Sequence, residues 1–129
     1  MARRAGLTRR PKASAKSAAA VRRQLLRAAL SYPGAWEDHP WGETVVKVGK
    51  KVFVFFGLQR GGLHVTCKLP HSFEAALSSL PFAEATGYGL GKSGWVSASF
   101  GPKDDVPVDL LKQWIDESYT AIAPKRRAK

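Results

Sequence analysis

A glycine-rich segment at residues 87–94 contains the string Gly91-Lys92-Ser93, which resembles the end of a phosphate-binding P-loop. A P-loop also needs a glycine five positions before the first residue of this string, and Thr86 stands there instead. Moreover, a P-loop opens a helix whose N-terminus holds the phosphate, whereas the residues from Gly94 onward predict a β-strand. We therefore predict a flexible turn and no nucleotide hydrolysis, with Lys92 able to contact an anion.

Three potential metal ligands, His64, Cys67 and His71, lie close together in the sequence. Imidazole and thiolate groups bind metals, but His64 and Cys67 stand three apart on a predicted strand, so their side chains point to opposite faces. We predict that Cys67 is a small core residue and that His71 is a polar residue at a helix start. We expect no metal site and no cofactor.

A general base is conceivable at His39, which follows two acidic residues in the polar, aromatic segment 35–42. Hydrolysis would also need a nucleophile and an orienting group, and no serine lies in a recognisable nucleophile turn. A connector that contains Trp36 and Trp41 is more often a packed structural loop. We predict no catalytic residue and a protein that is not an enzyme.

Lysines crowd the turn of a predicted β-hairpin, and Arg60 and Lys68 are expected nearby. A β-ribbon is narrow enough to enter a major groove, where lysines at its tip would contact phosphates without reading the base sequence. Lysines at turns and sheet edges also keep strands soluble and unpaired, so this second interpretation stays open. The three lysines of this hairpin are Lys47, Lys50 and Lys51.

The net charge of +11 is divided very unevenly along the chain. Thirteen of the 21 basic residues lie in the two ends, which contain no acidic residue. The middle of the chain contains the other eight basic residues and all ten acidic ones, so the ends carry +13 and the middle −2. Flexible basic ends attract any polyanion, so they favour nucleic acid as a partner without identifying a site in the folded part. The basic residues of the ends are Arg3, Arg4, Arg9, Arg10, Lys12, Lys16, Arg22, Arg23, Arg27, Lys125, Arg126, Arg127 and Lys129.

The 129 residues fit one domain, and a hydrophobic content of 44% can supply its core. A single cysteine excludes an intramolecular disulfide and favours a reducing compartment. No apolar run approaches the roughly 20 residues that cross a bilayer, so we expect a cytoplasmic monomer without a membrane partner. The Arg- and Ala-rich start also resembles an organellar transit peptide, which leaves an organellar location as the alternative.

Apolar spacing and turn residues predict three helices and five strands. The helices are expected from Ser17 to before Pro33, from Pro70 to about Leu80, and from Pro107 to before Pro124, with Leu111, Trp114, Ile115, Ser118 and Ile122 forming the buried stripe of the last. The strands are expected at Thr44–Val48, Val52–Phe56, Leu63–Lys68, 82–86 and Trp95–Phe100. The second strand is apolar on both faces, with Phe53 and Phe55 on the same one, which favours a central, buried position.

This order, α-β(3)-α-β(2)-α, predicts an α+β two-layer sandwich in which helices cover a five-stranded antiparallel sheet. The folded domain is expected to span residues 17–123. Residues 1–16 are expected to form a disordered basic tail, because they cannot bury enough surface to become ordered, and residues 124–129 a second basic tail.

Several short strings in this order resemble the MmcQ/YjbR-like family over about residues 20–124. They are Ser31-Tyr32-Pro33-Gly34, Pro40-Trp41-Gly42, Lys47-Val48-Gly49-Lys50-Lys51-Val52-Phe53, Cys67-Lys68-Leu69-Pro70, Gly91-Lys92-Ser93-Gly94-Trp95-Val96 and Glu117-Ser118-Tyr119. The resemblance implies a compact α-β(3)-α-β(2)-α fold of the double-wing, CyaY-like type. It also implies a function without an assigned reaction, since family members are often described as candidate DNA-binding proteins that use hairpins as wings.

We therefore expect a non-enzymatic DNA-binding protein that makes weak, sequence-tolerant phosphate contacts. Its contacts are expected from Lys47, Lys50, Lys51, Arg60, Lys92 and the basic tails. The slightly acidic middle and the aromatic connector favour an alternative, a protein-interaction or small-ligand-binding module with accessory tails.

Overall fold

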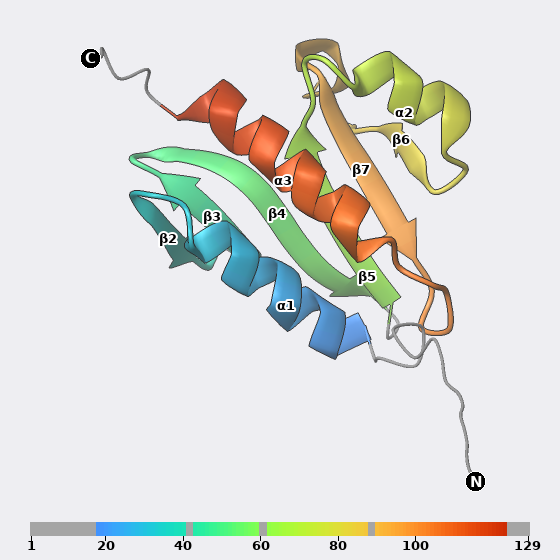
Figure 1. The fold of residues 1–129 in the computed structure, drawn as a ribbon, viewed down its shortest axis with the longest axis horizontal. Helices are drawn as coiled ribbons and strands as arrows, with labels where there is room; N and C mark the ends of the chain where they lie inside the picture. The colour runs from blue at the N-terminus through green and yellow to red at the C-terminus, as the bar shows by residue number, and fades with distance from the viewer. Residues whose placement is uncertain (1–17, 41–42, 60–61, 88–89, 124–129) are drawn as a thin grey trace, which may run out of the picture.

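The computed structural model describes residues 18–40, 43–59, 62–87 and 90–123. Its elements are, in chain order, α1 (Ala18–Leu30), β2 (Ala35–Asp38), β3 (Thr44–Val48), β4 (Lys51–Gln59), β5 (Gly62–Lys68), α2 (Phe73–Ser79), β6 (Ala83–Ala85), the 3₁₀ helix η3 (Leu90–Ser93), β7 (Trp95–Phe100) and α3 (Val108–Ile122). The strands form one antiparallel sheet in the order β2-β3-β4-β5-β7-β6, with α1 and α3 packed across it (Figure 1). The α+β class and the antiparallel sheet are thus confirmed.

The predicted number of five strands is wrong, because the described sheet contains six. The additional strand is β2, which the sequence predicts as part of a connector. Its four residues pair with β3 from Ala35 opposite Val48 to Asp38 opposite Val45. These residues include no β-branched side chain, and none of them is fully buried, so their intrinsic preference for a strand is low. The strand forms because its backbone pairs with the edge of β3. The short strand expected at 82–86 is confirmed as β6.

Strand β4 is central, as its two apolar faces predict, but a β-bulge changes the face of one residue. The bulge lies where the register between β3 and β4 shifts, at Phe53. The ring of Phe53 meets the ring of Tyr119 on α3 at a centroid separation of 5.1 Å. The ring of Phe55 instead meets Trp95 on β7, at 5.6 Å. The prediction that Phe53 and Phe55 share a face is therefore wrong, because an extra residue restarts the alternation of side chains.

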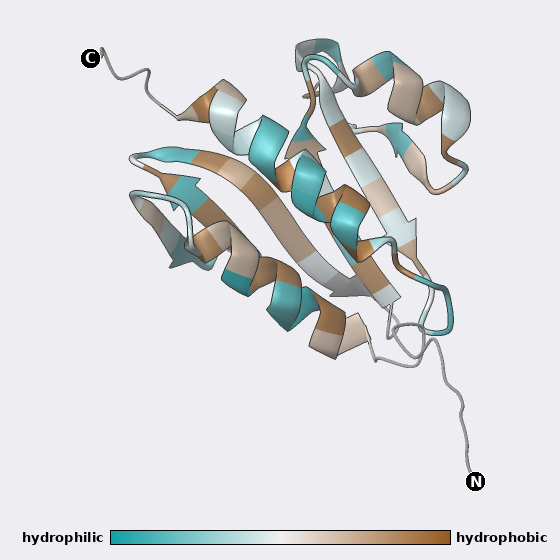
Figure 2. Cartoon of the chain, viewed as in Figure 1, coloured by the Kyte–Doolittle hydropathy of each residue, from teal (hydrophilic) through white to brown (hydrophobic). Residues whose placement is uncertain are grey.

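One hydrophobic core lies between the helices and the sheet. Val21 and Leu25 of α1 and Leu111 and Ile115 of α3 are buried against the central strands. Figure 2 shows hydrophobic residues along those strands and polar residues on the outward side of the two helices. The predicted stripe of α3 is confirmed, except that Ile122 is only partly buried. No helix in the described part is long and apolar enough to cross a membrane.

The opposite face of the sheet is closely packed as well. Val45, Phe55, Thr66 and Ser97 form a cross-strand row there, and Val45 has no exposed surface. The hydroxyl oxygens of Thr66 and Ser97 are 2.9 Å apart, and the hydroxyl of Thr86 is 2.9 Å from the same serine oxygen. These buried hydroxyl groups therefore satisfy one another.

Candidate nucleic-acid interface

The turn between β3 and β4 presents two lysines to solvent. Gly49 has a φ of 63°, a left-handed conformation that favours glycine and lets β4 fold back directly on β3. Lys50 and Lys51 follow it, and both are exposed. The indole nitrogen of Trp36 donates a hydrogen bond of 2.9 Å to the carbonyl oxygen of Gly49, so β2 braces the turn from the sheet edge. This geometry places both lysines at the exposed tip of the hairpin.

Lys47 of the same hairpin is already engaged. Its Nζ lies 2.7 Å from a carboxylate oxygen of Asp38 and 5.2 Å from the centroid of the Trp36 ring. The hydrogen bond from Lys47 lowers the pKa of Asp38 below its usual value, and the backbone N–H of His39 adds to this effect. The structure thus places Lys47 in an ion pair with β2, apart from the exposed lysines of the turn.

Lys92 lies on η3, in a compact turn that leads into β7. The N–H of Gly91 donates to the carbonyl oxygen of Thr86 at 2.9 Å, and a Cβ on Gly91 would stand only 2.9 Å from the Cβ of Ala85. Glycine is therefore needed for η3 to pack this closely. The sequence predicts a flexible turn here, whereas residues 90–93 form a 3₁₀ helix; as predicted, the segment leads into a strand, unlike a P-loop. Lys92 is exposed, beside a cavity of about 460 Å³ that His71 also lines.

These lysines lie at the same end of the sheet because of the strand order. The β3–β4 turn, the end of β5 and the start of β7 are aligned by their registers, so Lys68 at the end of β5 stands between the β3–β4 turn and η3. Strands are spaced about 4.8 Å apart, so β4 and β7 are separated by roughly 10 Å. Figure 1 shows the β3–β4 turn, the start of β7 and the C-terminal end of α3 toward one end of the sheet.

The remaining predicted contacts lie outside the described residues. Arg60, which follows β4 in the sequence, is one of them. The predicted contacts in the tails and Trp41 of the connector also lie outside the described residues. The tail contacts are Arg3, Arg4, Arg9, Arg10, Lys125, Arg126 and Arg127.

The groups considered for metal binding or catalysis are separated in the fold. Cys67 is fully buried in the core, as predicted, and burial raises the pKa of its thiol above the usual range. His64 lies on the other sheet face, with Nδ1 2.9 Å from the hydroxyl of Ser99. The exposed His39 has Nε2 2.7 Å from a carboxylate oxygen of Glu37. Among the described residues, no three His, Cys, Asp or Glu side chains could hold a metal ion.

Three consecutive residues of α3 connect the parts of the domain, a role that sequence reasoning missed. One carboxylate oxygen of Glu117 accepts hydrogen bonds from the backbone N–H groups of His71 and Ser72, and the other accepts from the hydroxyl of Ser72. Ser72 caps α2 without a side-chain bond of its own to the helix, so Glu117 supplies the acceptor for this helix start. The sequence signals were the presence of Glu117-Ser118-Tyr119 among the family-like strings and the predicted burial of Ser118.

The next two residues connect the sheet and the end of α1. The Ser118 hydroxyl donates to the carbonyl oxygen of Phe53 and accepts the backbone N–H of Lys68 at 2.9 Å, and it thereby joins β4 to β5 just beyond their last ladder pair. The Tyr119 hydroxyl donates to the carbonyl oxygen of Pro33 at 2.7 Å. The string Glu117-Ser118-Tyr119 therefore has a structural role, holding α2, the sheet and the 31–34 turn against α3.

Comparisons with known proteins agree with this architecture. No curated protein matches the chain. A solved structure of the Deinococcus radiodurans protein DR2400, which carries the domain DUF419, is similar with a TM-score of 0.61 at 25% sequence identity, covering 77% of this chain and 75% of that one. The YjbR family model matches residues 30–121, most of the described fold. The chain therefore belongs to the YjbR family.

Proposed function

We propose that the protein binds DNA without catalysing a reaction, through phosphate contacts at the lysine-bearing end of its sheet. The observation that carries the proposal is the convergence of Lys50, Lys51 and Lys92 from two separate turns. All three are exposed, and no carboxylate of the described residues forms an ion pair with them. Ammonium groups without an ion-pair partner on exposed turns are suited to phosphate oxygens, and such contacts do not read the base sequence.

The ion pair of Lys47 refines the set of residues proposed to bind. An ammonium group that already has a carboxylate partner must break that pair before it can contact a phosphate. We therefore assign Lys47 to supporting the hairpin, and Lys50 and Lys51 to contacting the polyanion. The basic tails add long-range attraction, which raises the association rate and the salt dependence.

Titration of labelled duplex DNA with the full chain at two or more salt concentrations tests this proposal. Replacing Lys50, Lys51 and Lys92 together by Gln should weaken binding and reduce the salt slope by up to about 2.7, since each duplex phosphate contact contributes about 0.9. The matched control replaces Arg23 of α1 and Lys103 and Lys112 near the start of α3, of which Lys112 is only partly exposed, by Gln.

Equal losses in the two variants would show that only total charge matters, and the proposed interface would then be wrong. A third variant, with Arg3, Arg4, Arg9 and Arg10 replaced by Gln, measures the contribution of the N-terminal tail. If that change alone abolishes binding, the folded domain is not the DNA-binding part. Wild-type protein that binds no better than an unrelated peptide of equal charge would overturn the function itself.

A further inference from the structure

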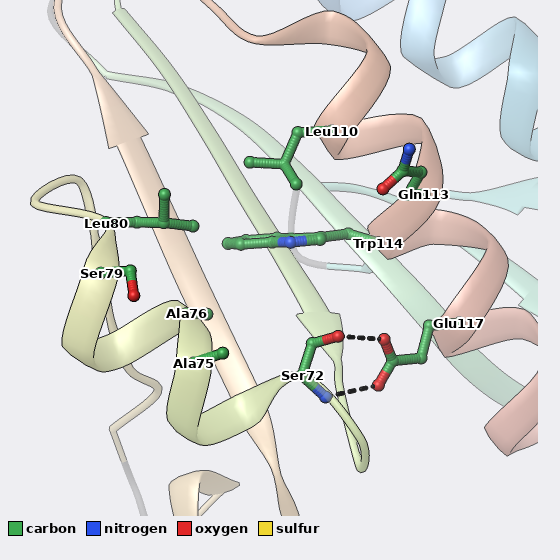
Figure 3. A pocket seen from close by; sticks show the side chains of 9 residues that line it. All are labelled: Ser72, Ala75, Ala76, Ser79, Leu80, Leu110, Gln113, Trp114 and Glu117. Atoms are coloured by element: carbon green, nitrogen blue, oxygen red, sulfur yellow. Dashed lines mark hydrogen bonds between the residues drawn. The ribbon is translucent and has the colours of Figure 1, made fainter.

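A cavity separates α2 from α3, on the helix side of the sheet and away from the β3–β4 turn. Its volume is about 290 Å³, near the lower limit of about 300 Å³ for small-molecule sites. Its walls are mainly apolar, with a few polar groups at its ends. The residues that line it are Ser72, Ala75, Ala76, Ser79, Leu80, Leu110, Gln113, Trp114 and Glu117 (Figure 3).

The indole of Trp114 lines this cavity and has an unsatisfied hydrogen-bond donor. Only 3% of Trp114 is exposed, and no described residue accepts a hydrogen bond from its ring nitrogen. Figure 3 shows the ring nearly edge-on, reaching from α3 toward Leu80 with Leu110 above it, and with its nitrogen on the edge nearest the viewer. A buried indole N–H almost always has a partner, because leaving one unpaired is costly. The fold thus presents a free donor in an apolar slot.

The carboxylate at one end of the cavity limits the charge of an occupant. The carboxylate of Glu117 accepts three hydrogen bonds from His71 and Ser72, which hold it in place. Its negative charge disfavours an anion in the same small space. Gln113 and Ser79 at the rim add neutral polar groups. An occupant therefore needs an apolar body, a hydrogen-bond acceptor for the indole, and no negative charge.

We propose that this cavity binds a small, neutral molecule with an apolar body and a carbonyl oxygen that accepts the hydrogen bond of Trp114. Leu80, Leu110 and the two alanines of α2 contact the apolar body, and the carbonyl points to the indole nitrogen. This site is independent of the proposed DNA contacts.

Two-dimensional ¹H–¹⁵N NMR of the full chain tests the proposal, because the indole N–H of each tryptophan gives its own signal. The probes are chromone, a planar bicycle with a carbonyl, chroman, which lacks the carbonyl, and chromone-2-carboxylate, which adds a negative charge. Chromone should shift the Trp114 indole signal saturably, with a Kd on the order of 1 mM or tighter. Chroman should bind at least about fivefold more weakly, corresponding to about 1 kcal/mol for one hydrogen bond. The anionic probe should also bind more weakly than chromone.

Two variants separate binding in the cavity from effects on folding. Ala75→Leu fills part of the cavity from α2, and it should abolish the chromone shift while all indole signals remain dispersed. Ser78→Leu adds the same side chain at an exposed position of α2 that does not line the cavity, and it should bind as wild type does.

Three results would overturn the proposal. The first is a chromone shift no larger at Trp114 than at Trp36, whose indole already has a partner. The second is equal binding of chroman, and the third is unchanged binding by Ala75→Leu. The variant in which Lys50, Lys51 and Lys92 are replaced by Gln should bind chromone as wild type does. Loss of DNA binding in that variant would therefore leave the cavity site unaffected.

Discussion

The replacement Ser118→Ala tests whether one hydroxyl joins β4, β5 and α3. Ser118 has no exposed surface, and its hydroxyl both donates to Phe53 and accepts from Lys68. Alanine removes both bonds but leaves the backbone groups in place. The space vacated is that of a single oxygen atom, too small to admit a water molecule that could replace it.

The expected loss of stability follows from those two backbone groups. The N–H of Lys68 has one hydrogen and loses its partner, and the carbonyl of Phe53 loses one donor. A buried group left unpaired costs about 1–3 kcal/mol, so two groups give roughly 2–6 kcal/mol. The bond at Lys68 is only partly buried, which favours the lower half of this range. Alanine is the better helix former by up to about 0.5 kcal/mol, which offsets a small part. We expect a net decrease of about 2–3 kcal/mol in the free energy of unfolding.

Urea unfolding followed by tryptophan fluorescence measures this change, provided that the m-value stays constant. The corresponding decrease in Tm is roughly 10 °C for a domain of this size. Thr120→Ala, at an exposed position of the same helix, is the matched control and should change stability by less than about 0.5 kcal/mol. If Ser118→Ala is as stable as the control, the hydroxyl does not hold the strands and the assigned role of this string is wrong.

Three further predictions concern Glu117, Tyr32 and Cys67. Glu117→Gln keeps the size of the side chain but weakens the acceptor for the start of α2. It should therefore reduce the free energy of unfolding by about 1–2 kcal/mol and speed amide exchange in that helix. The control Asp109→Asn, on the exposed side of α3, should have neither effect. Burial and the nearby Asp116 carboxylate raise the pKa of Tyr32 from 10.0 to about 12, so the folded protein retains a proton that the unfolded chain loses in this range. Stability must therefore fall as the pH rises from about 10 to 12, and less steeply in Tyr32→Phe; identical pH profiles would contradict this assignment. The fully buried thiol of Cys67 should react with Ellman's reagent at least about a hundredfold more slowly in the native protein than in urea, and rapid native labelling would place it outside the core.

Much of the fold could be predicted from local patterns. Apolar residues at helical spacing located α1 and α3, and alternation between turn residues located most strands, because these periods follow from the covalent geometry of the chain. The double apolar face of β4 indicated its central position. Strand β2 could not be found in this way, since its Ala-Trp-Glu-Asp sequence becomes a strand only through the free edge of β3.

The candidate site was predictable only as a set of residue types. The lysines of the β3–β4 turn and Lys92 could be named as candidate contacts, and the charge of the ends could be counted. Their arrangement at one end of the sheet depends on the strand order, which brings segments about 40 residues apart into register. The pairing of Lys47 with Asp38 likewise depends on the unpredicted strand β2.

The sequence by itself determined the α+β class, the periods of its elements and the division of charge between basic ends and a slightly acidic middle. These properties depend on composition and on neighbours within a few residues. Only the tertiary structure decided which lysine is paired, which carboxylate holds α2, and that the indole of Trp114 lines a cavity without a partner. Each of these depends on contacts between residues far apart in the chain, whose geometry is set by packing rather than by local preference.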